Sequence, residues 1–151
     1  MPRWLTLFLA TNGGLGYAPF ASGTIGTLAG LPLFWLVSAW PAWLYGLSWL
    51  ALLCLSFVVA DGAGKIYGVV DDGRIVIDEL VGYLVTVAFL PCTWWVLLGG
   101  FCWFRVFDIF KPWPASYFDK QMKNGVGVVL DDVVAGVYGA VALRLCLWLF
   151  A

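Results

Sequence analysis

The sequence predicts an all-α membrane protein, a polytopic bundle of about five hydrophobic helices, four of which can be full spans. The first observation is composition, because the chain is 63% hydrophobic and only 11% charged. The second is charge distribution: residues 4–60 and 80–104 contain no charged residue, and only Arg144 interrupts the run after Asp132. A spanning helix needs about 20 largely apolar residues. Such runs indicate a membrane protein, folded as a single domain over residues 1–151.

Prolines separate the apolar stretches. Pro41 stands between the first two, which is typical of a tight helical hairpin. Gly26, Gly30 and Pro32 are expected to loosen the first helix of that hairpin. Pro91 marks the next break. The expected helices occupy residues 24–40, 42–60, 75–90, 94–110 and 132–150.

Residues 80–104 have two interpretations. A single span of 25 residues would place Asp78 and Asp108 on opposite sides of the bilayer, about 30 Å apart. A hairpin that turns at Pro91 returns both to one face, although each leg then has only about 16 apolar residues. The hairpin also places seven of the eight basic residues on that face, so the positive-inside rule makes it cytoplasmic. We therefore expect a hairpin, with the active-site loops on the cytoplasmic face.

The residue types that are missing exclude several mechanisms. The chain has no histidine, which excludes a phosphohistidine intermediate, a histidine base and a histidine-ligated zinc. The four cysteines lie in or beside apolar runs without Cys-x-x-Cys spacing, so they are expected to be buried apolar side chains. Cys102 precedes Arg105 by only three residues, too few for the phosphate loop of a thiol phosphatase. Chemistry must therefore depend on carboxylates, lysine, arginine and a metal.

Six charged residues abut or enter apolar helices. A charge at membrane depth costs at least about 2.5 kcal/mol on insertion scales unless it is paired or hydrated, so these six are candidates for function. The acidic residues Asp61, Asp71, Asp72 and Asp119 are expected to be solvated loop residues instead. The six candidates are Asp78, Glu79, Arg105, Asp108, Asp131 and Asp132.

The spacing of the charges favours a phosphate site. Arg105, Asp108 and Lys111 recur every three residues and share one helical face, which suits either a structural ion-pair ladder or a phosphate held beside a carboxylate-bound metal. Asp78 and Asp132 are each followed four residues later by a glycine, which allows their helices to approach closely. Asn124 lies in a glycine-rich turn whose N–H groups could cradle an anion, a weak signal.

The candidate ligands offer only oxygen atoms, which favours a hard cation, and Mg²⁺ fits best. A site at headgroup depth suits a phospholipid substrate in the membrane, and no nucleic-acid partner is expected. The sequence does not indicate an oligomeric state. The expected metal ligands are Asp78, Glu79, Asp108, Asp131 and Asp132.

The motifs together resemble the phosphatidylglycerophosphatase A family, the magnesium-dependent membrane phosphatases of bacteria. The resemblance covers residues 16–136 and includes "GYAPFASGTIGTLAGLP", "KIYGVVDDGRIVIDELVG", "FRVFDIFKPWP" and "GVGVVLDDVVAG". It implies hydrolysis of phosphatidylglycerophosphate to phosphatidylglycerol and phosphate in phospholipid biosynthesis, in the bacterial inner membrane. Two positions depart from the family pattern: Ser22 stands where proline is expected, and Asn124 where glycine is expected.

The family motifs and the charge spacing together assign provisional roles. We expect Asp78, Asp108 and Asp132 to be catalytic, and the resemblance adds Thr24 to Arg105 and Lys111 as contacts of the substrate phosphate. With no histidine, direct attack by metal-activated water is preferred to an aspartyl-phosphate intermediate.

Two other functions were considered. A phosphotransferase that acts on CDP-activated lipids also uses clustered aspartates and Mg²⁺, but "DGAGK" lacks the rest of that motif. A small carboxylate-dependent transporter would need charges near the bilayer midplane, whereas here they cluster towards one face. Only Arg144 lies deep in a span, where snorkelling or a packing role is expected.

Overall fold

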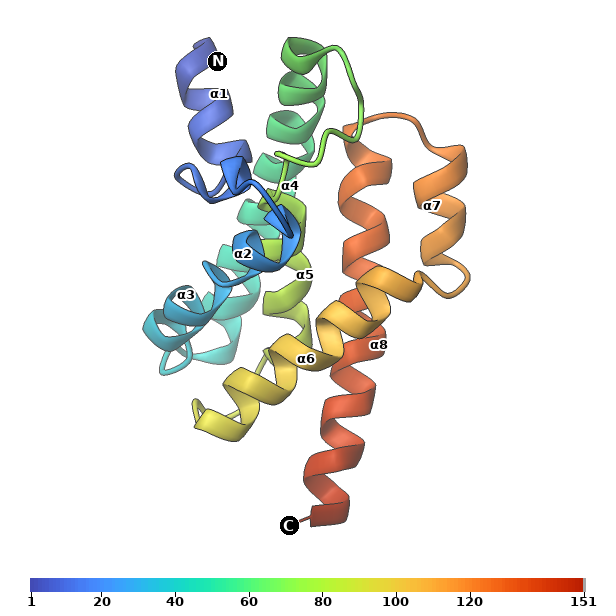
Figure 1. Ribbon diagram of the computed structural model, residues 1–151. Coiled ribbons are helices and arrows are strands. Elements are labelled where there is room, and N and C mark those ends of the chain that lie inside the picture. The colour runs from blue at the N-terminus through green and yellow to red at the C-terminus, as the bar shows by residue number, and fades with distance from the viewer. Residues whose placement is uncertain (151) are drawn as a thin grey trace.

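The computed structural model describes residues 1–150, and in this range all regular secondary structure is helical (Figure 1). The expectation of an all-α protein is therefore confirmed. The elements are α1 (Arg3–Ala10), the 3-10 turn η1 (Leu15–Tyr17), α2 (Ser22–Thr27), α3 (Gly30–Val37), α4 (Ala42–Tyr67), α5 (Ile77–Val87), α6 (Trp94–Phe110), α7 (Ala115–Gln121) and α8 (Gly125–Phe150).

Two of the described helices, α4 and α8, are long and apolar enough to cross a membrane. Each has 26 residues, about 39 Å at 1.5 Å per residue. Only 17% and 22% of their apolar windows are buried, so most of these side chains face outward, unlike the core helix of a soluble protein. The expected bundle of about five hydrophobic helices with four full spans is not confirmed, because α5 and α6 have 11 and 17 residues and the first apolar run divides into α2 and α3.

The hairpin at Pro91 is confirmed. Helix α5 ends at Val87, and α6 begins at Trp94 and runs obliquely across α8 (Figure 1). Both Asp78 and Asp108 therefore reach one pocket. Helix α8 contacts α4, α5, α6 and α7, which makes it the central element.

Two glycines allow α5 and α8 to cross closely. A Cβ atom on Gly82 would lie 2.5 Å from the carbonyl oxygen of Asp132, and one on Gly136 would overlap with the backbone of Gly82. The hydroxyl of Thr86 lies 3.1 Å from the carbonyl oxygen of Gly136, one turn further along. The expectation that small residues bring these helices together is therefore confirmed.

Arg144 joins the same two helices further from the pocket. Its Nη2 atom donates to the carbonyl oxygen of Ala88 at 2.6 Å, and Nη1 lies 3.4 Å from that of Thr86. These carbonyls belong to the C-terminal end of α5, where helical carbonyls lack intrahelical partners. Arg144 therefore caps α5, which is the expected packing role.

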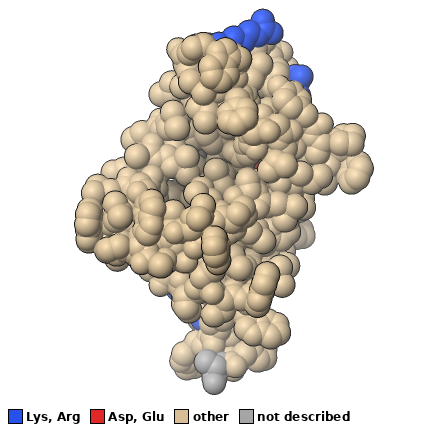
Figure 2. Space-filling view, turned by 90° about the vertical axis from the view of Figure 1, so that its left-hand side faces the viewer, with Lys and Arg blue, Asp and Glu red and all other residues tan. Residues whose placement is uncertain are grey.

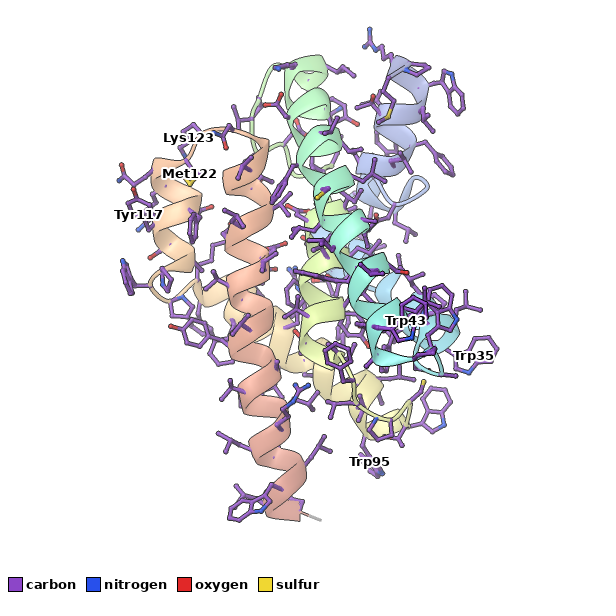
Figure 3. All side chains as sticks on the ribbon, turned by 180° about the vertical axis from the view of Figure 1, so that it is seen from behind. Trp35, Trp43, Trp95, Tyr117, Met122 and Lys123 are labelled. Carbon is purple, nitrogen blue, oxygen red and sulfur yellow. The ribbon has the colours of Figure 1, made fainter. Side chains whose placement is uncertain are left out.

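Three exposed tryptophans lie away from the basic end of the molecule. Figure 3 shows Trp35, Trp43 and Trp95 near one end and Lys123 near the other. Figure 2 shows a side face that is almost uncharged, with basic atoms mainly at its top. The expected burial of the cysteines is wrong: Cys54 of α4 and Cys102 of α6 are exposed, because these helices turn apolar side chains outward, and Cys92 and Cys146 are half-buried.

Candidate active site

An open pocket of about 400 Å³ lies where α2, α5, α6 and α8 meet. Among the described residues, six carboxylates and two cations line it, a clear excess of negative charge. Apart from Asp71, every one of these charged residues was predicted as part of the site. The charged lining residues are Asp71, Asp78, Glu79, Arg105, Asp108, Lys111, Asp131 and Asp132.

Two helix N-termini bring carboxylates to the pocket. Asp78 and Glu79 occupy the first turn of α5, where the positive end of the helix dipole stabilises acidic side chains. Asp131 and Asp132 lie in the second turn of α8. Asn124 caps α8, because its Oδ1 atom accepts from the N–H of Gly127 at 2.9 Å. The turn at Asn124 therefore serves as a cap for the helix that carries the two aspartates.

Arg105 joins carboxylates of two helices. Its Nη1 atom lies 3.3 Å from Glu79 Oε1 and also hydrogen-bonds to Asp108 Oδ2. The guanidinium is mostly buried, and its Nε atom has no hydrogen-bond partner among the described residues. The Arg105–Asp108 contact is the expected ion pair along α6, whereas the contact with Glu79 fixes α6 to α5.

Lys111 follows α6 and reaches two other elements. Its ammonium group donates to Asp119 of α7 at 2.9 Å and to Asp131 of α8. Partial burial alone would lower the pKa of Lys111, but the Asp131 carboxylate and the hydrogen bonds to Asp131 and Asp119 raise it above its usual value. Lys111 therefore stays charged beside the pocket, and the ladder on α6 does not extend from Asp108 to Lys111.

The carboxylates differ in how their oxygen atoms are engaged. Glu79 and Asp131 have both oxygens in contact with donors. Asp78 and Asp108 each have one oxygen engaged. No described side-chain or backbone group hydrogen-bonds to the carboxylate of Asp132, although the residue is only 3% exposed. Asp78, Asp108 and Asp132 are therefore the carboxylates with oxygen atoms available to a ligand.

The donor set has the chemistry for a hard cation. Buried carboxylates that outnumber the neighbouring cations favour an added positive charge, and oxygen donors match Mg²⁺. Within residues 1–150, no three acidic or cysteine side chains already form a metal-binding group. The fit therefore rests on the charge and type of the donors.

A loop between α4 and α5 closes one side of the pocket. It contributes Asp71 and Gly73, and the Oγ atom of Ser22 donates to the carbonyl of Gly73 at 2.6 Å. Arg74 binds Asp72 at 2.7 Å, which lowers the pKa of that carboxyl, and stacks over the Tyr67 ring at 3.8 Å. Ser22, which replaces the expected proline, thus anchors this loop to α2.

Sequence reasoning missed several residues. Thr24 was expected to contact phosphate, yet in the described structure it is not among the residues that line the pocket. Thr27 instead lies 3.0 Å from Glu79. Asp71 and Asp119 were expected to be merely solvated, but Asp71 lines the pocket and Asp119 binds Lys111.

Comparisons with known proteins give family matches that cover most of the chain. The model of the family phosphatidylglycerophosphatase A matches residues 8–147. The chain is 38% identical to phosphatidylglycerophosphatase A of Escherichia coli, over 87% of this chain and 77% of the relative. It is 36% identical to phosphatidylglycerophosphatase A of Haemophilus influenzae, over 89% of this chain and 84% of the relative. A Bacteroides thetaiotaomicron protein with the provisional name phosphatidylinositol-3-phosphatase is 33% identical, over 97% and 96%.

No solved structure matches the chain significantly. The family assignment therefore rests on the sequence comparisons, which cover most of the chain and include every charged residue of the pocket. The chain belongs to the phosphatidylglycerophosphatase A family.

Proposed function

We propose that this protein hydrolyses the phosphomonoester of phosphatidylglycerophosphate and releases phosphatidylglycerol and inorganic phosphate, as a step of bacterial phospholipid biosynthesis. The family makes the chain a phosphoric monoester hydrolase. The observation that supports a phosphorylated substrate is the convergence of Arg105 and Lys111 with six carboxylates in one pocket. The two cations suit a phosphate group, and the carboxylates suit a metal beside it.

We propose Mg²⁺ as the cofactor, held by the carboxylates whose oxygen atoms are available: Asp78, Asp108 and Asp132. When bound, Mg²⁺ supplies Lewis-acid polarisation of the phosphoryl oxygens. Glu79 and Asp131, which were also expected to be ligands, are engaged with Arg105 and Lys111 and support those two cations instead.

The membrane placement is also a proposal. Helix α8 has 18 residues on the C-terminal side of its aspartates, from Val133 to Phe150, which is about 27 Å of helix. The hydrocarbon core is about 30 Å thick. If α8 crosses the inner membrane with its C-terminal end on the far side, the pocket lies at the cytoplasmic headgroup boundary. A phospholipid headgroup can reach it there, which also argues against a transporter with charges at the midplane.

The two cations and one of two aspartates have roles in direct attack by water. Arg105 and Lys111 offset the negative charge that spreads over the phosphoryl oxygens in the transition state. Asp108 or Asp132 orients the attacking water and accepts its proton. This route leaves no covalent intermediate, so borohydride should trap no acyl phosphate during a single turnover; a trapped acyl phosphate on a pocket aspartate would overturn it.

The test of function is release of inorganic phosphate by the purified protein in detergent. The substrates are phosphatidylglycerophosphate, phosphatidic acid and phosphatidylinositol 3-phosphate, the last because of the name of the Bacteroides relative. We expect the fastest release from phosphatidylglycerophosphate, its loss with a chelator and its recovery with Mg²⁺. Faster hydrolysis of either other lipid would refute the substrate, and activity that survives chelation would refute the cofactor.

A further inference from the structure

We propose that Thr27 is a positioning residue, which holds the carboxylate of Glu79 against Arg105 and thereby aims the guanidinium into the pocket. The inference rests on the proposed function, because it concerns how Arg105 meets a substrate phosphate. Thr27 does not line the pocket itself, and it acts through Glu79.

The contacts of Thr27 point to this role. Its side chain is completely buried, and its hydroxyl lies 3.0 Å from Glu79 Oε2 and 2.8 Å from the carbonyl oxygen of Gly23. A hydroxyl has one hydrogen to donate. The Gly23 carbonyl is also an acceptor within the helical ladder of α2, whereas a buried carboxylate without a donor is costly. The carboxylate of Glu79 is therefore the acceptor that depends on Thr27.

Gly23 completes the surface on which Glu79 rests. A Cβ atom at this position would overlap with Glu79 Oε1 and would lie 3.2 Å from Arg105 Nη1. Gly23 and Thr27 lie four residues apart, so they face the same side of α2. The glycine gives the carboxylate and the guanidinium room, and the threonine fixes the carboxylate by a hydrogen bond.

This arrangement orients the guanidinium group of Arg105. Glu79 Oε2 faces Thr27, which leaves Oε1 directed at Arg105 Nη1 at 3.3 Å. Without the hydroxyl, the carboxylate can rotate and the guanidinium loses one of its two anionic partners. Outer-shell partners that orient metal ligands typically contribute 10- to 100-fold to activity or affinity, and we expect a comparable effect from a partner that orients Arg105.

The experiment compares Thr27→Val, Thr27→Ser and a control, Thr86→Val. Thr86 is also completely buried, and its hydroxyl also lies near a carbonyl four residues earlier and an acceptor on another helix. That second acceptor is the backbone of Gly136 and not a pocket carboxylate, so Thr86→Val measures the structural cost of removing such a hydroxyl. Turnover, KM and the thermal unfolding midpoint are measured for each variant in detergent with Mg²⁺.

We expect Thr27→Val to lower kcat/KM by about 10- to 100-fold. Thr27→Ser should retain most of the activity, and Thr86→Val should lower the midpoint without a comparable loss of turnover. In a Glu79→Gln background, Thr27→Val should add little further loss, because it acts through Glu79. If Thr27→Val does not fold, Thr27→Ala takes its place.

Three results would overturn the inference: wild-type kinetics in Thr27→Val, equal losses in Thr27→Ser and Thr27→Val, or full additivity with Glu79→Gln. The wild-type protein in the same assay tests the proposed function separately. A wild type that releases no phosphate refutes that function, whereas an active wild type with an equally active Thr27→Val refutes only the role of Thr27.

Discussion

Asp131 and Asp132 are adjacent in the sequence, yet their carboxylates have different surroundings. Both oxygens of Asp131 accept hydrogen bonds, one from Lys111. Asp132 is equally buried, and within the described chain its carboxylate has no donor. A buried carboxylate without a hydrogen-bond donor is costly unless it binds a cation or a proton. We therefore expect Asp132 to be the most important of the proposed metal ligands.

The prediction for this residue is that Asp132→Asn lowers turnover by more than about 100-fold, beyond the effect typical of groups that only support a ligand. Binding of Mn²⁺, followed by electron paramagnetic resonance as a probe of the Mg²⁺ site, should weaken in parallel. Asp61→Asn is the control, because Asp61 lies outside the pocket and pairs with Lys65 at 2.6 Å. Normal Mn²⁺ binding by Asp132→Asn would remove Asp132 from the proposed metal ligands.

A second prediction concerns Asp119, which contacts Lys111. Asp119 holds Lys111 from α7, so Asp119→Asn should lower activity moderately, by less than Asp132→Asn, because Asp131 still contacts the ammonium. The sequence alone suggested only a solvated loop residue at position 119. The measurement is steady-state turnover of both variants. A loss in Asp119→Asn as large as that in Asp132→Asn would indicate a more direct role for Asp119.

The sequence predicted which charged residues line the site better than it predicted the contacts among them. Charges beside apolar runs identified Asp78, Arg105 and Asp108, because their position carries an energetic cost that is visible in the composition. The partners of Thr27 and Lys111 depend on how α2 and α7 dock, and an uncharged threonine or a loop aspartate has no comparable signal in one sequence. Thr24 was expected as a phosphate contact because it lies in the segment "GYAPFASGTIGTLAGLP", which resembles the family.

At the scale of elements, the crossing of α5 and α8 determines whether the aspartates meet. Gly82→Ala would place a methyl group 2.5 Å from the carbonyl oxygen of Asp132 and against Phe104. Overpacking of this kind costs roughly 1–3 kcal/mol. We expect a lower thermal unfolding midpoint and lower activity, since the two helices must separate.

Gly46 provides the matched control within α4. A Cβ atom there meets nothing within 4 Å. Gly46→Ala should therefore leave the free energy of unfolding unchanged or raise it by about 0.4–1 kcal/mol, and the midpoint should not fall. Equal midpoints for Gly82→Ala and Gly46→Ala would show that the close crossing is not essential.

Helix boundaries were predicted unevenly. Pro41 and Pro91 correctly marked turns, because proline cannot continue a helix from within. The division of the first run into α2 and α3 was anticipated only as a loosening at Gly26, Gly30 and Pro32, and α5 is shorter than its apolar run. Hydropathy counts apolar residues without regard to whether the backbone turns. Four full spans were therefore possible from the sequence, whereas two described helices have the length.

At the scale of the whole molecule, Lys123 lies towards one end, and Trp35, Trp43 and Trp95 lie towards the other (Figure 3). Asp72 lies in the loop between α4 and α5 and Lys120 lies in α7, and we expect both to face the cytoplasm. In a cysteine-free background, single cysteines at these positions should resist an impermeant thiol reagent in intact cells and react in inverted vesicles. A cysteine at Phe150, which is 88% exposed at the opposite end of α8, should show the reverse. Labelling of only one of these two positions in intact cells would refute the shared face.

Arg144 also has a consequence for biosynthesis. Ala88 precedes Arg144 by 56 residues, so the ribosome completes α5 long before its capping partner exists. In a nascent chain the last carbonyls of α5 must find water or other donors, because hydrocarbon offers none. Asp131 and Asp132 arrive on the same late helix. If α8 inserts into the membrane as proposed, its arrival would satisfy the end of α5 and bring Asp131 and Asp132 to the pocket in one event.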